Sequence, residues 1–446
     1  MNQSNQPLGP DESSEAIAEK LLSDDQHYVD AVTSLGDRQA VVATQDIRGS
    51  HGIKLVAKGG RINSTLREKL CSHQLQPGLD SALAVENGVT PESLAVAAGQ
   101  HIDDHPFWQQ LSIKSGNPLA LRHGLASIRL PAELAFKLTV AREQRPLLFE
   151  HSLRVAIVAN YLALRLGMDE KSTQNLLLAA LCHDLGDMHT DPAILDPNHS
   201  ISIDERKFVY VHPATGYVIL RDISGIPPVV ARAVFHHHER LDGSGYPSGL
   251  EGGQIEPLAL PLMVAEVTDS VMSRFADYSR LSILLRLNQG KYDSKSVALI
   301  YDTIPIDLAG ASATHFSTDS RRQQLLNFSK LLGEWSNFRR FVDEKSMASG
   351  QKGLAILQAR LLNINSLLLD FGFDPARCDA LIQLAEDDPE IGTELSQVLD
   401  EMQFKFAEIA REIERNANDI YDNLSDAQQL AFARWRLTLQ RVLEHS

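Results

Sequence analysis

The sequence has few cysteines and no excess of positive charge. Its three cysteines are far apart, at Cys71, Cys182 and Cys378, which excludes a disulfide framework and a zinc site of closely spaced thiolates. The 42 Lys and Arg residues are outnumbered by 58 Asp and Glu residues, which gives a formal net charge of -16. This charge argues against binding to a nucleic-acid polymer or to an anionic membrane surface.

Two further absences concern the cellular location. The first residues, MNQSNQPLGPDESSEAIAEK, lack the basic segment and apolar core of a secretory signal. The chain also lacks a continuous apolar run of about 18 residues, the length that suggests a membrane-spanning helix. We therefore expect a cytoplasmic protein with no membrane partner.

The length of 446 residues corresponds to about three domains. Short β-prone runs between glycines follow residue 39, and long Leu, Ala and Val faces with helical spacing follow residue 150. We expect a mainly α-helical protein in five parts: a flexible acidic leader (1–27), a small α+β accessory module (28–90), a helical connector (91–145), an all-helical domain (146–305) and a C-terminal helical bundle region (320–446).

Apolar residues near the C-terminus recur at alternating steps of four and three. They are Leu395, Leu399, Met402, Phe406, Ile409, Ile413 and Ile420, with Asn416 at the remaining position of the series. The spacing predicts a packed helical seam. Two structures satisfy it, namely an amphipathic helix inside a bundle or a coiled coil that joins two copies into a homodimer.

Histidine is the residue that carries the chemical information. Eight of the 16 histidines lie between residues 151 and 238, where even spacing would place about three. His183 and Asp184 are adjacent in the apolar helix LLLAALCHDLGD, where burial of both groups is costly without polar partners or metal ions. His236, His237 and His238 end another apolar helix, and neighbouring imidazoles are suitable ligands for Fe, Mn or Zn. The pattern predicts a metal centre in an all-helical domain.

At these residues the sequence resembles the HD-GYP subgroup of the HD phosphohydrolase superfamily. His183 and Asp184 match the HD pair, and Gly245, Tyr246 and Pro247 match GYP. The resemblance extends from about residue 151 to about residue 304, through the segments HSLRVA, AALCHDLGD, HPATGYVIL, HHERLDGSGYP and VAEVTDSVMSR. It implies a helical domain with two or three metal ions, commonly Fe or Mn, that hydrolyses the cyclic dinucleotide cyclic di-GMP.

The resemblance also implies a set of metal ligands and a catalytic pair. The ligands are His151, His183, Asp184, His212, His237, His238 and Glu266. Asp184 would bridge the ions and orient the attacking hydroxide, with His183 beside it as the other member of the catalytic pair. Members with a third metal carry a glutamate where this chain has Leu147, so we expect two divalent ions, Fe or Mn. The loop with Gly243, Gly245, Tyr246 and Pro247 is expected beside His237 and His238, where it would shape the substrate cleft.

Three positions depart from the family pattern. Glu266 replaces an aspartate, and Asp187 replaces a lysine that contacts the substrate phosphate. The family's basic stretch is replaced by SRFADYSR, in which Arg274 and Arg280 are the candidates for phosphate binding, with Asp187 as the third substrate-binding candidate. Three functions therefore stay open: a cyclic di-GMP phosphodiesterase, a metal phosphohydrolase of another nucleotide, and a catalytically weak domain that acts in binding or signalling.

Overall fold

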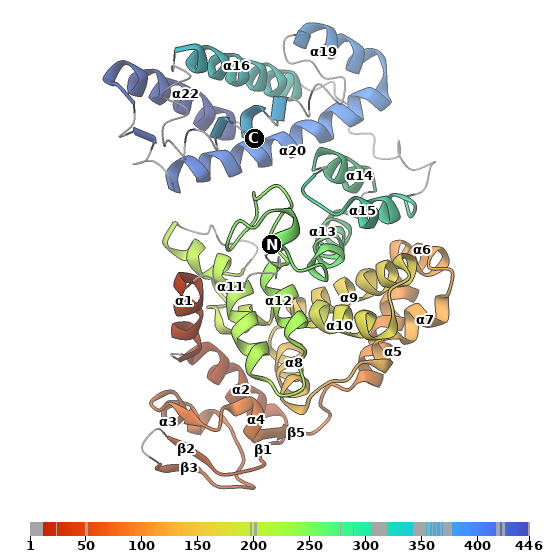
Figure 1. Ribbon diagram of the computed structural model, residues 1–446, viewed down its shortest axis with the longest axis vertical. Coiled ribbons are helices and arrows are strands. Elements are labelled where there is room, and N and C mark those ends of the chain that lie inside the picture. The colour runs from red at the N-terminus through yellow and green to blue at the C-terminus, as the bar shows by residue number, and fades with distance from the viewer. Residues whose placement is uncertain are drawn as a thin grey trace, which may run out of the picture. The chain divides into compact units, whose positions relative to one another are not determined.

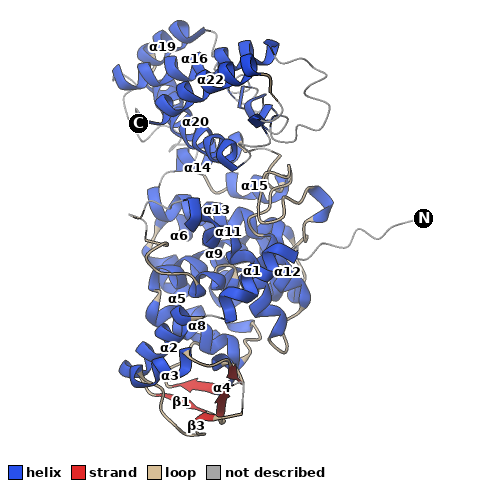
Figure 2. Ribbon diagram, turned by 90° about the vertical axis from the view of Figure 1, so that its left-hand side faces the viewer, coloured by secondary structure: helices blue, strands red, loops and turns tan. Residues whose placement is uncertain are grey.

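The computed structural model describes residues 12–23, 25–49, 52–196, 199, 203–276, 278–288, 290–304, 319–341, 354, 357–358, 360–362, 364–365, 368, 377–415, 420–421 and 424–444. Within these residues the chain is mainly helical with small N-terminal sheets (Figure 2), which confirms the predicted fold class. The chain divides into two compact units, one of residues 1–276 and 288–303 and the other of residues 277–287 and 304–446.

All the described strands lie in the N-terminal part of the first unit (Figure 2). β1 (Val41–Ala43) pairs antiparallel with β5 (Leu83–Val85), and β2 (Ile47–Gly49) lies between β3 (Lys54–Val56) and β4 (Leu75–Gln76), antiparallel to both. The short helices α3 (Arg67–Cys71) and α4 (Leu79–Ala82) belong to the same module. This is the small α+β element that the glycine-punctuated sequence predicts.

The two N-terminal helices extend into the segment predicted as a flexible leader. α1 (Glu12–Ser23) packs on α11 (Ile203–Asp222), where Ala18 joins a buried cluster with Val211, Ala214 and Phe235. α2 (Gln26–Arg38) begins at the N-cap Asp25 and buries Val29, Val32 and Leu35. In α1 and α2 this segment is therefore helical and not a flexible leader as expected. The polar composition of α1 includes an apolar face, and this face packs on α11, which lies far along the chain. Residues 1–11 lie outside the described residues.

The rest of the first unit is helical. Its helices are α5 (Pro91–Asp104), α6 (Pro106–Lys114), α7 (Pro118–His123), α8 (Ala132–Gln144), α9 (Pro146–Leu166), α10 (Glu170–Cys182), α11, α12 (Pro228–His236), α13 (Ala259–Phe275) and α15 (Ser294–Tyr301). α9 is the central element, packed against α10 and α13 (Figure 1). By length and composition alone α9 could cross a membrane, but 67% of its apolar window is buried inside the structure, as in a core helix.

The second unit contains α14 (Tyr278–Leu287), α16 (Asp319–Phe341), α19 (Cys378–Asp387), α20 (Pro389–Arg415) and α22 (Asp426–Glu444). The apolar seam predicted near the C-terminus, from Leu395 to Ile420, is at most 2% exposed and packs on other helices of the same chain. The bundle alternative therefore accounts for the seam, which is not available to a second copy. Asn416 lies outside the described residues. A homodimer through the C-terminal helices stays a prediction, and it would have to use a surface other than this seam.

Candidate metal centre

Four helices and the short 3-10 helix η3 (Leu185–His189) bring all seven predicted ligands together. His151 lies on α9, His212 on α11 and Glu266 on α13. The remaining four follow helix ends: His183 and Asp184 come directly after α10, and His237 and His238 directly after α12. The side chains form a first cluster (His151, His183 and Glu266) and a second cluster (Asp184, His212, His237 and His238). In each cluster the candidate ligand atoms lie within 4.8 Å of one another.

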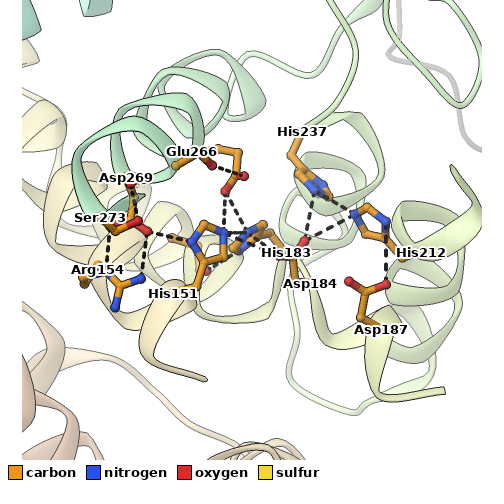
Figure 3. A network of polar contacts seen from close by, with 12 residues as sticks. His151, Arg154, His183, Asp184, Asp187, His212, His237, Glu266, Asp269 and Ser273 are labelled. Carbon is orange, nitrogen blue, oxygen red and sulfur yellow. Dashed lines mark hydrogen bonds and ion pairs between the residues drawn. The ribbon is translucent and has the colours of Figure 1, made fainter. Parts of the chain in front are cut away.

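Asp184 faces both clusters (Figure 3). Its Oδ2 lies 3.1 Å from His183 Nε2 and 3.5 Å from His151 Nε2. Its Oδ1 lies 3.3 Å from His212 Nε2 and 3.5 Å from His237 Nε2. One carboxylate oxygen is thus directed at each cluster, which is the arrangement required of a carboxylate that bridges two cations.

Unsatisfied backbone carbonyls orient three of the histidines. Pro213 has no N–H and so leaves the carbonyl of Val209 without its helical partner, and His212 Nδ1 lies 2.6 Å from that oxygen. His183 Nδ1 and His237 Nδ1 bond the carbonyls of Ala180 and Val234, at 2.8 and 2.5 Å, in the last turns of their helices. Since a carbonyl only accepts, each Nδ1 carries a proton, and the Nε2 of each ring, which has a lone pair in the neutral form, is directed into the centre.

These lone pairs face one another and need a cation. His151 Nε2 lies 3.2 Å from His183 Nε2, and His212 Nε2 lies 3.2 Å from His237 Nε2. Glu266 Oε2 is buried 2.9 Å from His151 Nε2 and 3.0 Å from His183 Nε2, yet it has no partner with hydrogen-bond geometry among the described residues. Such an arrangement of neutral imidazoles and a carboxylate is repulsive unless a proton or a metal ion lies between them. The donor set therefore fits a pair of metal ions.

The pKa values show how the protein behaves without metal. Burial by itself would lower the pKa of His183, but Asp184 and Glu266 raise it to about 10. Burial likewise opposes the raised pKa of His212, which Asp187 and Asp184 bring to about 9. Burial would raise the pKa of Asp184, but the surrounding histidines hold it well below its usual range. Without metal, the neighbouring carboxylates thus favour the protonated forms of His183 and His212, whereas burial lowers the pKa of His237 to about 4.

Asp269 contacts the first cluster but is absent from the set of ligands that the resemblance implies. It is fully buried, and its Oδ2 lies 2.7 Å from His151 Nδ1 (Figure 3). Its Oδ1 accepts a hydrogen bond of 2.8 Å from Arg154 Nε. The carboxylate therefore fixes the tautomer of His151 and leaves Nε2 free for a metal. Its position three residues after Glu266, on the same helix face, was a signal in the sequence.

The GYP loop packs directly on the second cluster. The ring of Tyr246 stacks on His238 with centroids 4.6 Å apart, and Tyr246 N–H donates to the His238 carbonyl. Glu239, which is fully buried, accepts the N–H groups of Ser248 and Leu250 and so anchors the loop. A Cβ at Gly245 would lie 2.4 Å from Glu239 Cα, so this close approach requires glycine. The loop thus lies beside His237 and His238, where the sequence placed it.

The three predicted substrate-binding residues lie in different parts of the structure. Asp187 lies beside His212, with its buried Oδ1 3.9 Å from His212 Nδ1, and burial raises the pKa of Asp187 to about 6. Arg274 is exposed in the last turn of α13, the helix that carries Glu266. Arg280 lies on α14 in the second unit, and its predicted role stays a prediction. Leu147, at the third-metal position, is 77% exposed on α9.

The part of the chain that carries this centre is similar to known proteins. Residues 138–293 match the family described as HD domain. Over 173 residues the chain is 31% identical to the 3'3'-cGAMP-specific phosphodiesterase 1 of Vibrio cholerae, covering 39% of this chain and 36% of the relative. It is 34% identical over 125 residues to a cyclic di-GMP phosphodiesterase of Pseudomonas aeruginosa, covering 28% of this chain and 30% of the relative. It is 35% identical over 121 residues to the response regulator RpfG of Xanthomonas campestris, also named a cyclic di-GMP phosphodiesterase, covering 27% of this chain and 32% of the relative.

The central part of the chain is therefore an HD domain. The resemblance drawn from its motifs is confirmed, since residues 138–293 match an HD domain and relatives that match this part of the chain are named cyclic di-GMP phosphodiesterases. The chain spans about a third of the length of these relatives. A solved structure of Bd1817, an HDG"Y"P protein from Bdellovibrio bacteriovorus, aligns with 48% of this chain and 69% of its own at 21% identity and a TM-score of 0.34.

Proposed function

We propose that the protein is a metal-dependent phosphodiesterase that hydrolyses a cyclic dinucleotide. The observation that carries the proposal is Asp184, which directs one carboxylate oxygen at each of two ligand clusters. Relatives that match this part of the chain are named phosphodiesterases of cyclic di-GMP or of 3'3'-cGAMP, which supports this substrate class. Within the class we propose cyclic di-GMP, cleaved to the linear dinucleotide, to GMP or to both.

The residues of the chain fit the needs of this reaction. His151, His183 and Glu266 would hold one ion, and His212, His237 and His238 the other, with Asp184 shared; we propose Fe or Mn. A metal pair lowers the pKa of a bound water and neutralises charge on the phosphoryl oxygens. Asp184 accepts a hydrogen bond from the attacking water and so orients it. Tyr246, stacked on His238, would lie beside a substrate bound at the second cluster.

Substrate binding depends on fewer positive charges than in the family pattern. We propose that Arg274, on the same helix as Glu266, contributes to phosphate binding, and that Asp187 does not contact phosphate directly. Asp187 would repel a phosphate oxygen as an anion, and its place against His212 directs it toward a ligand histidine.

The decisive experiment is an assay of the protein purified without oxygen and supplied with Fe²⁺ or Mn²⁺. Cyclic di-GMP and 3'3'-cGAMP are offered in parallel, and the products are separated by chromatography. We expect linear dinucleotide or GMP from the wild type and none from Asp184→Asn, while Asp191→Asn in the following loop retains activity. Absence of product from a protein that holds two metal ions per chain would contradict the proposal.

The negative charge of Asp187 favours a second candidate, a catalytically weak domain that binds a cyclic dinucleotide and signals its presence. Calorimetry of the metal-loaded protein with cyclic di-GMP distinguishes the two. Binding with no turnover would support the signalling function, and Asp187→Lys would then be expected to increase turnover by restoring a cation next to the phosphate. A third candidate, hydrolysis of another nucleotide, predicts neither binding nor turnover of the two cyclic dinucleotides.

A further inference from the structure

Five polar side chains from separate parts of the chain meet between the N-terminal module and the HD domain. Lys137, on α8, is only 1% exposed, and its Nζ lies 2.9 Å from Asp80 Oδ2, 3.1 Å from His189 Nε2 and 3.6 Å from the centroid of the Tyr28 ring. Tyr28 donates its hydroxyl proton to Asp80, and His189 Nδ1 donates to Asp25 Oδ2 over 2.6 Å. We call these five residues the junction cluster.

The junction cluster is complete only when the N-terminal module is docked. Asp25, Tyr28 and Asp80 belong to the module and its leading helices, whereas Lys137 and His189 belong to α8 and η3. A buried ammonium group is costly without its carboxylate and its other contacts, so each part holds the other in place. The cluster also lines a cavity of 480 Å³.

His189 is connected to the metal centre through a single short helix, η3. It is the last residue of η3, and Asp184 is the N-cap of the same short helix. Five residues of a 3-10 helix rise only about 10 Å. In the middle of η3, Gly186 packs so closely on α11 that a Cβ would lie 2.1 Å from the His212 carbonyl oxygen. η3 is therefore held at Asp184, at the His212 backbone and at His189.

We propose that His189 is a positioning residue for the metal centre, and that the N-terminal module, through Asp25, fixes the placement of Asp184. The catalytic part of this inference rests on the proposed function, whereas the part that concerns metal affinity does not. The N-terminal module would then be part of the machinery that assembles the centre. A change in its docking would alter metal affinity and turnover without touching a ligand.

The test compares His189→Leu, which removes both contacts, with His189→Gln, whose amide can donate to Asp25 and accept from Lys137. The control is His199→Leu, because His199 is an exposed histidine paired with Glu205 at 3.2 Å outside the junction cluster. Mn²⁺ affinity is measured by competition with a fluorescent chelator. Hydrogen exchange of residues 183–190 is followed by mass spectrometry in the metal-free protein.

We expect His189→Leu to bind Mn²⁺ about 10- to 100-fold more weakly, the usual effect of losing a residue that orients ligands. Exchange of residues 183–190 should be faster, and kcat for the cyclic dinucleotide should fall with little change in KM. His189→Gln should restore most of the affinity, and His199→Leu should match the wild type. Wild-type affinity and exchange in His189→Leu would overturn the proposal.

Asp25→Asn supplies a second test in case His189→Leu does not fold. Asparagine keeps the N-cap that Asp25 provides to Tyr28 N–H, at 3.0 Å, but removes the charge that faces His189. Weaker Mn²⁺ binding is expected from this variant as well, although the change lies 159 positions before Asp184 in the sequence. An unchanged affinity would contradict the role of the module. Failure of the wild type to cleave any cyclic dinucleotide would count against the proposed function alone.

Discussion

Replacement of Gly186 by alanine should disrupt the metal centre although glycine ligates nothing. The new Cβ would lie 2.1 Å from the carbonyl oxygen of His212 and 2.9 Å from its carbonyl carbon, whereas ordinary contacts begin at 3.4 Å. Both groups in conflict are backbone, so η3 and α11 must separate by about 1.3 Å, the difference between 2.1 and 3.4 Å. Metal–ligand distances tolerate about 0.2 Å, so Asp184 and His212 could no longer serve one ion together.

We expect Gly186→Ala to bind metal at least about tenfold more weakly and to lose about 1 to 3 kcal/mol of unfolding free energy, as overpacked cores do. Metal content after dialysis against buffered Mn²⁺ measures the first effect, and denaturant unfolding of the metal-free protein measures the second. The matched control is Gly99→Ala in α5, whose Cβ would meet only Arg122 at 3.7 Å. Full metal content in Gly186→Ala would refute the reasoning.

Three further predictions concern the same centre. Asp269→Asn should weaken metal binding about 10- to 100-fold, because a neutral amide orients His151 less firmly than the carboxylate and makes its Nε2 a weaker metal ligand. Unchanged Mn²⁺ affinity in chelator competition would contradict this role. Without metal, His183 and His212 have pKa values of about 10 and 9, so both are protonated at pH 7. Metal binding should then release protons and become stronger as the pH rises from 6 to 9. Calorimetry in buffers of different ionisation enthalpy measures the number of protons released, and a value of zero would contradict this prediction. Glu239→Gln, which keeps one acceptor for the loop amides, should speed hydrogen exchange of residues 243–250 and leave the metal content unchanged.

Much of the centre was determined by the sequence alone. The HD pair, the histidine before Pro213 and the triplet ending at His238 carry the family resemblance, and this resemblance predicts which side chains are ligands. Local backbone events also orient three of these residues, His183, His212 and His237, because a helix end or a proline leaves a carbonyl for His Nδ1. The helical fold class could be predicted as well, because the roughly 3.6-residue spacing of apolar side chains is also a local property of the sequence.

The tertiary structure alone decided which side chains support the ligands. Asp269 and His151 are 118 positions apart, and Asp25 and His189 are 164 apart, so no local pattern pairs them. The split of the Asp184 oxygens between two clusters also depends on how α9, α11, α12 and α13 pack. The apolar face of α1 could be placed on α11 only by the fold, since burial of an amphipathic helix depends on which partner surface lies within reach. Local sequence motifs thus predict the ligands, and long-range packing determines which side chains support them.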